Sequence, residues 1–177
     1  MERKSCGGLL IPGVAAVLIL AACGGSSTPL VETRGNGPTL GNEPVLLSPA
    51  QLRAQAALLG QPFYWAGPRK GYEYEFQRTS NGYVYVRYLR PGLLAGTAGR
   101  FLTISTYPFV GAFKAVKTEG KGDAAAGPGG SIVYVRAGDP TSVLIAFRGV
   151  PYEIEVYDPR PPVSVTVARS GRVQPVG

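Results

Sequence analysis

The segment from Tyr72 to Tyr88 constrains the fold most, because apolar and polar residues alternate along two consecutive runs within it. Successive side chains of a strand point to opposite faces, so each run predicts a strand with one apolar face. Asn81 and Gly82 lie between the runs and indicate the turn of an antiparallel hairpin. An isolated hairpin is barely stable in water, so the rest of the chain must cover its apolar face.

The turn sequence is compatible with two registers of this hairpin. A two-residue Asn-Gly turn would place the apolar residues of one strand beside charged residues of the other. A three-residue loop, Ser80 to Gly82, keeps apolar residues opposite one another and needs a positive φ at Gly82. We predict this second register, in which the pairs are Phe76 with Val86, Tyr74 with Tyr88, and Glu75 with Arg87.

A helix is predicted from Ser48 to Gly60. Ser48 suits the N-cap, Pro49 the first helical position, and Gln51 completes a capping box. Gly60 ends the helix where a left-handed residue is favoured. A second helix is expected to start at Pro108, and the segment 121–130, rich in glycine and alanine, is expected to be a mobile loop.

Five further runs are typical of strands, and their apolar residues alternate with polar ones or are β-branched. These runs are 101–107, 132–136, 143–147, 152–157 and 163–168. Together, the elements predict an α+β fold in which two helices pack on an antiparallel sheet, or on two small sheets, of about seven strands.

The first 23 residues resemble a bacterial lipoprotein signal. Basic residues near Glu2 precede an apolar run from Leu9, which ends in the lipobox Leu20-Ala21-Ala22-Cys23. The resemblance implies diacylglyceryl transfer to Cys23, cleavage before it, and anchoring at the extracytoplasmic face of the cell membrane. A cleaved secretion signal and a membrane-spanning anchor are the alternatives, although the apolar run is shorter than the roughly 20 residues that a spanning helix needs.

These features divide the chain into four parts. Residues 1–22 are the predicted signal peptide, and 23–47, rich in Gly, Ser, Thr, Asn and Pro, are a lipidated N-terminus and flexible tether. Residues 48–170 have the length of one ordinary domain, and 171–177 are expected to form a C-terminal tail.

Composition excludes several kinds of chemistry. The chain contains no histidine, and its two cysteines, Cys6 and Cys23, both belong to the signal and lipidation segment. Catalysis by Ser-His-Asp or Cys-His groups, zinc-hydrolase ligand sets and disulfides in the domain are therefore excluded. No phosphate-binding or dinucleotide motif is present, so we expect no metal and no cofactor.

The net charge of +7 comes from basic residues scattered between Arg3 and Arg172. Nucleic-acid binding usually needs a clustered basic stripe, so nucleic acid is not expected as a partner. An isolated pair such as Arg69-Lys70 is typical of a solvated turn. A mild attraction to anionic lipid or wall polymer is the secondary interpretation of the charge.

Two pairs of glutamates, Glu73 with Glu75 and Glu153 with Glu155, each share one face of a predicted strand. Paired carboxylates can act as acid and base on a glycan. Alternate charged residues more often keep the outer face of a sheet solvated, which is how we interpret both pairs. No catalytic residue is therefore assigned.

Tyr83, Tyr85 and Arg87 are predicted to point outward from the hairpin. Tyrosine and arginine are enriched where proteins contact partners, so these three residues are the candidate contacts with a partner or ligand. The many other tyrosines suit strands or the core, and Trp65 is expected to be a core residue near a loop.

Three segments resemble parts of uncharacterised secreted actinobacterial proteins, a resemblance that implies no activity and no residue roles. The segments are Tyr64-Trp65-Ala66-Gly67-Pro68, Val84-Tyr85-Val86-Arg87-Tyr88-Leu89 and Ile154-Glu155-Val156-Tyr157-Asp158-Pro159. The sequence predicts a non-catalytic envelope lipoprotein that binds an envelope protein, a wall polymer or a small apolar ligand. The alternatives are a carboxylate-dependent hydrolase of envelope glycans and a structural partner subunit without a small ligand.

Overall fold

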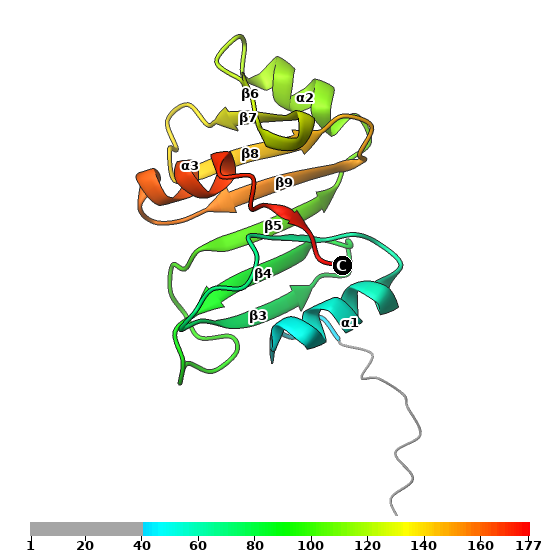
Figure 1. The fold of residues 1–177 in the computed structure, drawn as a ribbon, viewed down its shortest axis with the longest axis vertical. Coiled ribbons are helices and arrows are strands. Elements are labelled where there is room, and N and C mark those ends of the chain that lie inside the picture. Colours follow the sequence, from blue (N-terminus) through cyan, green and yellow to red (C-terminus); the bar gives the residue numbers. More distant parts are fainter. Residues whose placement is uncertain (1–40) are drawn as a thin grey trace, which may run out of the picture. The chain divides into compact units, whose positions relative to one another are not determined.

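The computed structural model describes residues 41–177 (Figure 1). Its helices are α1 (Pro49–Leu59), α2 (Ala112–Glu119) and α3 (Pro161–Arg169), with a 3₁₀ turn η1 (Pro128–Gly130). Its strands are β1 (Val45–Leu47), β2 (Tyr64–Trp65), β3 (Glu73–Arg78), β4 (Val84–Leu89), β5 (Thr103–Pro108), β6 (Ala125–Ala126), β7 (Ser131–Val135), β8 (Ser142–Phe147), β9 (Tyr152–Tyr157) and β10 (Gln174–Pro175).

Eight strands form one antiparallel sheet in the order β1-β3-β4-β5-β9-β8-β7-β6, and β10 pairs with β2 in a separate ribbon. Two meanders, β3-β4-β5 and β7-β8-β9, meet where β5 pairs with β9, as Figure 1 shows. The α+β class is confirmed. The counts differ, because residues 41–177 hold three α-helices and ten strands where the sequence predicts two and about seven.

The main apolar core lies on one face of the large sheet. Alternate residues of β8 show the two faces, since Val143 and Ile145 belong to the main core cluster and Leu144 and Ala146 to a smaller second cluster. Residues of α1, α3 and β2 join the main cluster together with Val173 and Val176, which flank β10, whereas α2 packs on the second. Trp65 is 6% exposed in the main core, as predicted.

The N-terminal helix α1 has the predicted ends. The Ser48 hydroxyl accepts from the backbone N–H of Gln51, and the Gln51 side chain accepts from the backbone N–H of Ser48. Pro49 occupies the first turn, and Gly60 ends the helix in the left-handed conformation at φ +61°. The capping box is confirmed.

The predicted register of the β3–β4 hairpin is also confirmed. Phe76 lies opposite Val86 and Glu75 opposite Arg87, and Gly82 has φ +78°. A one-residue slip would turn every apolar side chain of one strand away from the core, which explains why patterning predicts the register correctly.

The segment Val163–Ala168 is helical, so the predicted last strand is wrong. Its buried residues are Ser164 and Ala168, which are four apart as on one face of a helix. Pro161 and Pro162 stand in the first turn, where a fixed φ is favourable and a backbone N–H is not needed. The start signal therefore outweighs the strand preference of the valines.

The second helix begins later than predicted. Pro108 ends β5, and α2 starts at Ala112 after Gly111, which has φ +84°. The segment 121–130, predicted to be a loop, contains the short edge strand β6 and the turn η1. Both differences arise from strand pairing. Pro108 pairs with β9, and β6 pairs with β7, and no local sequence pattern predicts either pairing.

The domain extends beyond 48–170 at both ends. β1, inside the expected tether, pairs with β3. The expected C-terminal tail contains β10, which pairs with β2, and the two valines that flank it, Val173 and Val176, are buried in the main core. The signal peptide, the lipobox with Cys23 and most of the tether lie outside the described residues. Among residues 41–177, no helix combines the length and apolar character needed to cross a membrane.

Candidate functional site

Strand polarity brings four chain segments together at one end of the large sheet. The start of β3, the end of β4, the start of β5 and the end of β9 lie at the same end, because these neighbours are antiparallel. Each of these segments carries an arginine just outside its strand. They are Arg69 before β3, Arg90 after β4, Arg100 before β5 and Arg160 after β9.

The four arginines line one pocket of about 210 Å³, which we call the arginine pocket. Its floor and walls also include aromatic, aliphatic and acidic side chains. These are Tyr72, Tyr88, Phe101, Leu102, Asp158 and Pro159. The pocket lining therefore has four guanidinium groups and one carboxylate, and this excess of positive charge favours an acidic ligand.

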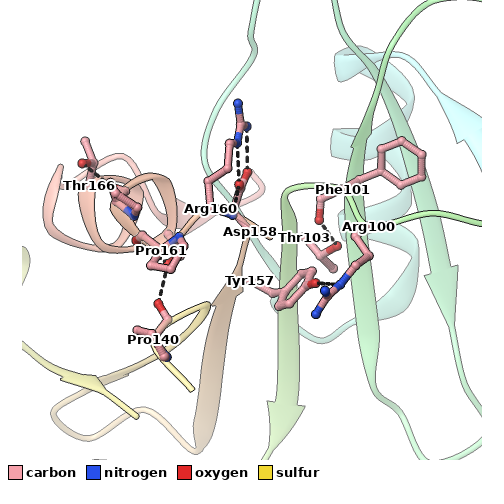
Figure 2. A network of polar contacts seen from close by, with 11 residues as sticks. Arg100, Phe101, Thr103, Pro140, Tyr157, Asp158, Arg160, Pro161 and Thr166 are labelled. Carbon is pink, nitrogen blue, oxygen red and sulfur yellow. Dashed lines mark hydrogen bonds and ion pairs between the residues drawn. The ribbon is translucent and has the colours of Figure 1, made fainter. Parts of the chain in front are cut away.

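The carboxylate of Asp158 is already paired. It is fully buried, and Oδ1 accepts from the backbone N–H and the Nε–H of Arg160 at 2.9 Å each. Oδ2 accepts from Nη2 of the same residue at 3.1 Å. Figure 2 shows this fork at the point where the chain turns from β9 into α3. These bonds raise the pKa of Arg160, which keeps its guanidinium charged.

Two arginines stack on one tyrosine. The guanidinium carbons of Arg69 and Arg90 lie 4.6 and 4.7 Å from the ring centroid of Tyr72. Within residues 41–177, neither guanidinium donates a hydrogen bond to another side chain. A stacked guanidinium keeps its N–H donors at its edge, so both residues can donate to an anion in the pocket.

Arg100 is held in place by Tyr157. Its Nε donates to the Tyr157 hydroxyl at 2.5 Å, and its guanidinium carbon lies 5.7 Å from the same ring (Figure 2). One of its three nitrogen atoms is thereby used, which leaves the two terminal amino groups for a ligand.

A buried ion pair supports the loop that carries Arg90 and Arg100. Nη1 of Arg87 donates to Oε1 of Glu75 at 2.6 Å, and the Glu75 side chain is only 1% exposed. Oε2 of Glu75 accepts from the backbone N–H of Gly96 at 2.7 Å, and Arg87 donates to the carbonyl of Thr97 at 2.9 Å. The Arg87 guanidinium also stacks on Phe101, a wall of the pocket.

This pair corrects the prediction that alternate charges on the hairpin face solvent. Glu75 and Arg87 do lie opposite each other, but the 90–101 loop covers them. Arg87 holds that loop in place with its donors, and it does not line the arginine pocket. It is therefore a positioning residue for the pocket.

The segment before β3 is fixed by two buried tyrosines. The Tyr74 hydroxyl accepts from the backbone N–H of Arg69 at 2.6 Å. The Tyr88 hydroxyl accepts from the N–H of Ala66 at 2.7 Å and donates to the carbonyl of Gly67 at 3.1 Å. Burial raises the pKa of Tyr88, so its hydroxyl stays protonated as a donor.

The predicted contacts Tyr83 and Tyr85 lie elsewhere. Both are half-buried on the sheet face opposite the main core, where their rings lie edge-on to Tyr107 at 5.1 and 6.1 Å between centroids. The Tyr107 hydroxyl donates to Glu155 at 2.7 Å. The structure does not bring these tyrosines to the arginine pocket, and their contact with a partner stays a prediction.

The glutamate pairs also lie outside the pocket. Glu73 and Glu75 lie on β3 and Glu153 and Glu155 on β9, with β4 and β5 between them. Both carboxylate oxygens of Glu155 accept hydrogen bonds, from Tyr107 and Ser142. Burial raises the pKa of Glu153, although Arg136 counteracts this rise.

Sequence reasoning missed the arginine pocket, because its members are far apart in the chain. One signal was available, since each arginine stands just outside a predicted strand. Four such positions come together once the strand order is known, but the pairing of β5 with β9 is not visible in the sequence.

A scan of protein-family models, a search of curated proteins and a search of solved structures each found no match to this chain. Among residues 41–177, no group of three or more His, Cys, Asp or Glu side chains is arranged to hold a metal ion. The candidate site rests on the geometry of the pocket itself.

Proposed function

We propose that this protein is a lipid-anchored protein of the cell envelope that binds an acidic ligand without catalysing its conversion. The observation that carries the proposal is the convergence of Arg69, Arg90, Arg100 and Arg160 on one pocket. The single carboxylate there, Asp158, is buried and paired with Arg160. The remaining positive charge attracts a negatively charged partner.

The chemistry of the lining residues supports binding. Arginine stays protonated throughout the physiological pH range and cannot exchange protons in a reaction. The hydroxyl of Tyr88 and the carboxylate of Asp158 hold backbone and side-chain N–H groups in place. These bonds fix the backbone around the pocket, and a rigid frame for the arginine donors is what recognition of an anion needs.

The lipobox supports the location. Lipidation of Cys23 would place two acyl chains on the sulfur, enough for stable anchoring. A ligand of the arginine pocket would then be an acidic component of the envelope, either a protein or a wall polymer.

Calorimetric titration of the purified protein with inorganic phosphate tests the proposal. We expect saturable binding that weakens with added salt, and about a tenfold loss in Arg90→Gln, because one charge-assisted hydrogen bond contributes about 1.5 kcal/mol or more. Arg148→Gln is the matched control. Arg148 stacks on Phe113 at 4.7 Å and lies before β9, at the opposite end of the strand from Asp158. Equal binding by all three proteins would contradict the proposal.

A further inference from the structure

The arginine pocket carries more positive charge than a singly charged group can balance. Arg160 and Asp158 neutralise each other as an ion pair. Within residues 41–177, Arg69, Arg90 and Arg100 form no ion pair. Three guanidinium groups in the lining of one pocket are therefore uncompensated. Because like charges repel, a ligand with two negative charges stabilises this arrangement more than a ligand with one.

The side chains of the pocket offer many hydrogen-bond donors and few acceptors. Asp158 accepts with both carboxylate oxygens from Arg160, and the Tyr88 hydroxyl is already bonded to the backbone. Tyr72 carries the one other side-chain oxygen of the lining. An acidic group that still holds an O–H would therefore find few acceptors, whereas a fully ionised group can accept from each guanidinium.

The size of the pocket limits the ligand to a compact acidic group. The volume of about 210 Å³ holds on the order of seven water molecules. Tyr72 anchors the guanidinium groups of Arg69 and Arg90, and Tyr157 anchors that of Arg100. A tetrahedral group with three terminal oxygens has an acceptor for each of these three guanidinium groups. A planar carboxylate has only two oxygens for the three.

We propose that the arginine pocket binds the dianion of a phosphomonoester, which is a phosphate group joined to one carbon chain. Such a group carries about 1.5 to 2 negative charges near pH 7 and three strong acceptor oxygens. A phosphodiester, a sulfate ester and a carboxylate each carry a single charge. This inference rests on the proposed function, because it names the class of acidic ligand that the same pocket takes. The phosphate lies in the pocket, and the larger part of the ligand lies outside it.

The titration of the ligand gives its binding a pH dependence, because the second pKa of a phosphomonoester is about 6. The groups that face the pocket are its four arginines, Tyr72, Tyr88 and the paired Asp158, and the charge of Arg172 also acts on Tyr88. The chain contains no histidine, the side chain that ordinarily titrates in this range, and arginine stays charged. Burial raises the pKa of Tyr88, further from neutral pH. A change in affinity between pH 5 and pH 8 therefore reports on the ligand.

Calorimetric titration of the purified protein at pH 5 and pH 8 tests the inference. The probes are glycerol phosphate, dimethyl phosphate and methyl sulfate. At pH 8 we expect glycerol phosphate to bind at least about tenfold tighter than either singly charged probe, because it forms additional charge-assisted hydrogen bonds. Its affinity should fall about tenfold at pH 5, where roughly one molecule in ten is a dianion. Methyl sulfate keeps its single charge, so its equal affinity at both pH values would control for titration of the protein.

Arg100→Gln tests the third guanidinium group. We expect this variant to weaken the binding of glycerol phosphate about tenfold at pH 8 and that of methyl sulfate by a smaller factor, because a single charge uses fewer of the donors. Arg148→Gln, which lies outside the pocket, should change neither affinity. The comparison of probes and of pH values needs only the unchanged protein, so it tests the inference even if a variant unfolds.

A short-chain phosphatidic acid, used below its micelle concentration, identifies what carries the phosphate, because it presents the same group on a lipid. Binding that is tighter than that of glycerol phosphate and is lost in Arg90→Gln would support a lipid as the carrier. Equal affinity would support a carrier that contacts the pocket through its phosphate alone.

The outcomes separate this inference from the proposed function. If no probe binds in a manner that depends on Arg90, the proposed function and the inference both fail. If a singly charged probe binds through Arg90 as tightly as glycerol phosphate at pH 8, the phosphomonoester inference alone is overturned. An affinity for glycerol phosphate that is the same at pH 5 and pH 8 would overturn it as well, and the pocket would then be a general site for anions.

Discussion

Glu75 and Arg87 form a pair that differs in energy from an ordinary surface ion pair. Exposed pairs contribute about 0 to 1 kcal/mol, because water competes for both charges. Here the Glu75 side chain is 1% exposed and the Arg87 side chain 19%, and both also bind the backbone of the 90–101 loop. Removing one member would leave a buried charge without its partner.

We therefore predict that Arg87→Ala lowers the free energy of unfolding by about 3 kcal/mol, as measured by urea denaturation. Phosphate binding should weaken as well, because the loop that carries Arg90 and Arg100 loses its support. Arg148→Ala also removes a guanidinium stacked on an aromatic ring and should cost less than about 1 kcal/mol. If Arg87→Ala lowers the free energy of unfolding no more than this control does, the Glu75–Arg87 pair contributes no more than an ordinary surface ion pair.

Glu153 gives the fold a pH dependence of definite sign. Burial raises its pKa, Glu119 and Glu155 add to the rise, and Arg136 opposes it. A carboxyl with a raised pKa in the folded state binds its proton more tightly there than in the unfolded chain. Its ionisation therefore destabilises the fold, by an amount that is complete above the folded pKa and absent below the unfolded value near 4.5.

Glu153→Gln should accordingly be more stable than the unchanged protein at pH 7, and this advantage should disappear as the pH falls to about 4. Thermal unfolding of both proteins across this range measures the difference. An advantage that grows as the pH falls would show that attraction to Arg136 outweighs burial.

At the scale of elements, α3 shows how a local start signal decides between helix and strand. The valines of 163–168 alternate as in a strand, and this alternation led to the wrong prediction. Before these valines, Pro161 and Pro162 occupy the first turn of α3. The buried Asp158 accepts from the backbone N–H of Arg160 and fixes the direction in which the chain enters that turn. The β3–β4 hairpin was predicted correctly because its turn residues and its alternation of apolar residues indicate the same structure. At α3 the prolines indicate the start of a helix whereas the valines indicate a strand. The burial of Ser164 and Ala168, which accompanies the helix, depends on tertiary packing.

Asp158→Asn should therefore destabilise the protein by about 2 kcal/mol, because hydrogen bonds to a charged acceptor contribute about 1.5 to 3 kcal/mol and the amide adds a buried donor. Asp139→Asn is a matched control, since Asp139 also precedes a proline but is exposed. It should cost less than about 0.5 kcal/mol. Equal effects in chemical denaturation would show that Asp158 does not anchor the start of α3.

At the scale of the whole molecule, the arginine pocket is a product of strand order. The β3–β4 hairpin is predicted from the sequence, which puts Arg69 before it and Arg90 after it. Only the pairing of β5 with β9 places Arg100 beside Tyr157 and brings Arg160 to the same pocket. That contact joins residues about fifty positions apart, which is beyond the reach of local patterns.

Membrane anchoring, which we propose to occur through lipidation of Cys23, is the remaining property at the scale of the whole molecule. A single acyl chain holds a protein only transiently at a membrane, while the two chains of a diacylglyceryl group hold it stably. The scattered positive charge of the domain adds only a weak, salt-sensitive attraction. Cys23→Ser should therefore move the protein from the membrane fraction to the soluble or secreted fraction, or leave it unprocessed, as fractionation and mass spectrometry of the N-terminus would show. A variant that is still cleaved before residue 23 and stays on the membrane after a high-salt wash would show that another feature of the chain provides the anchor.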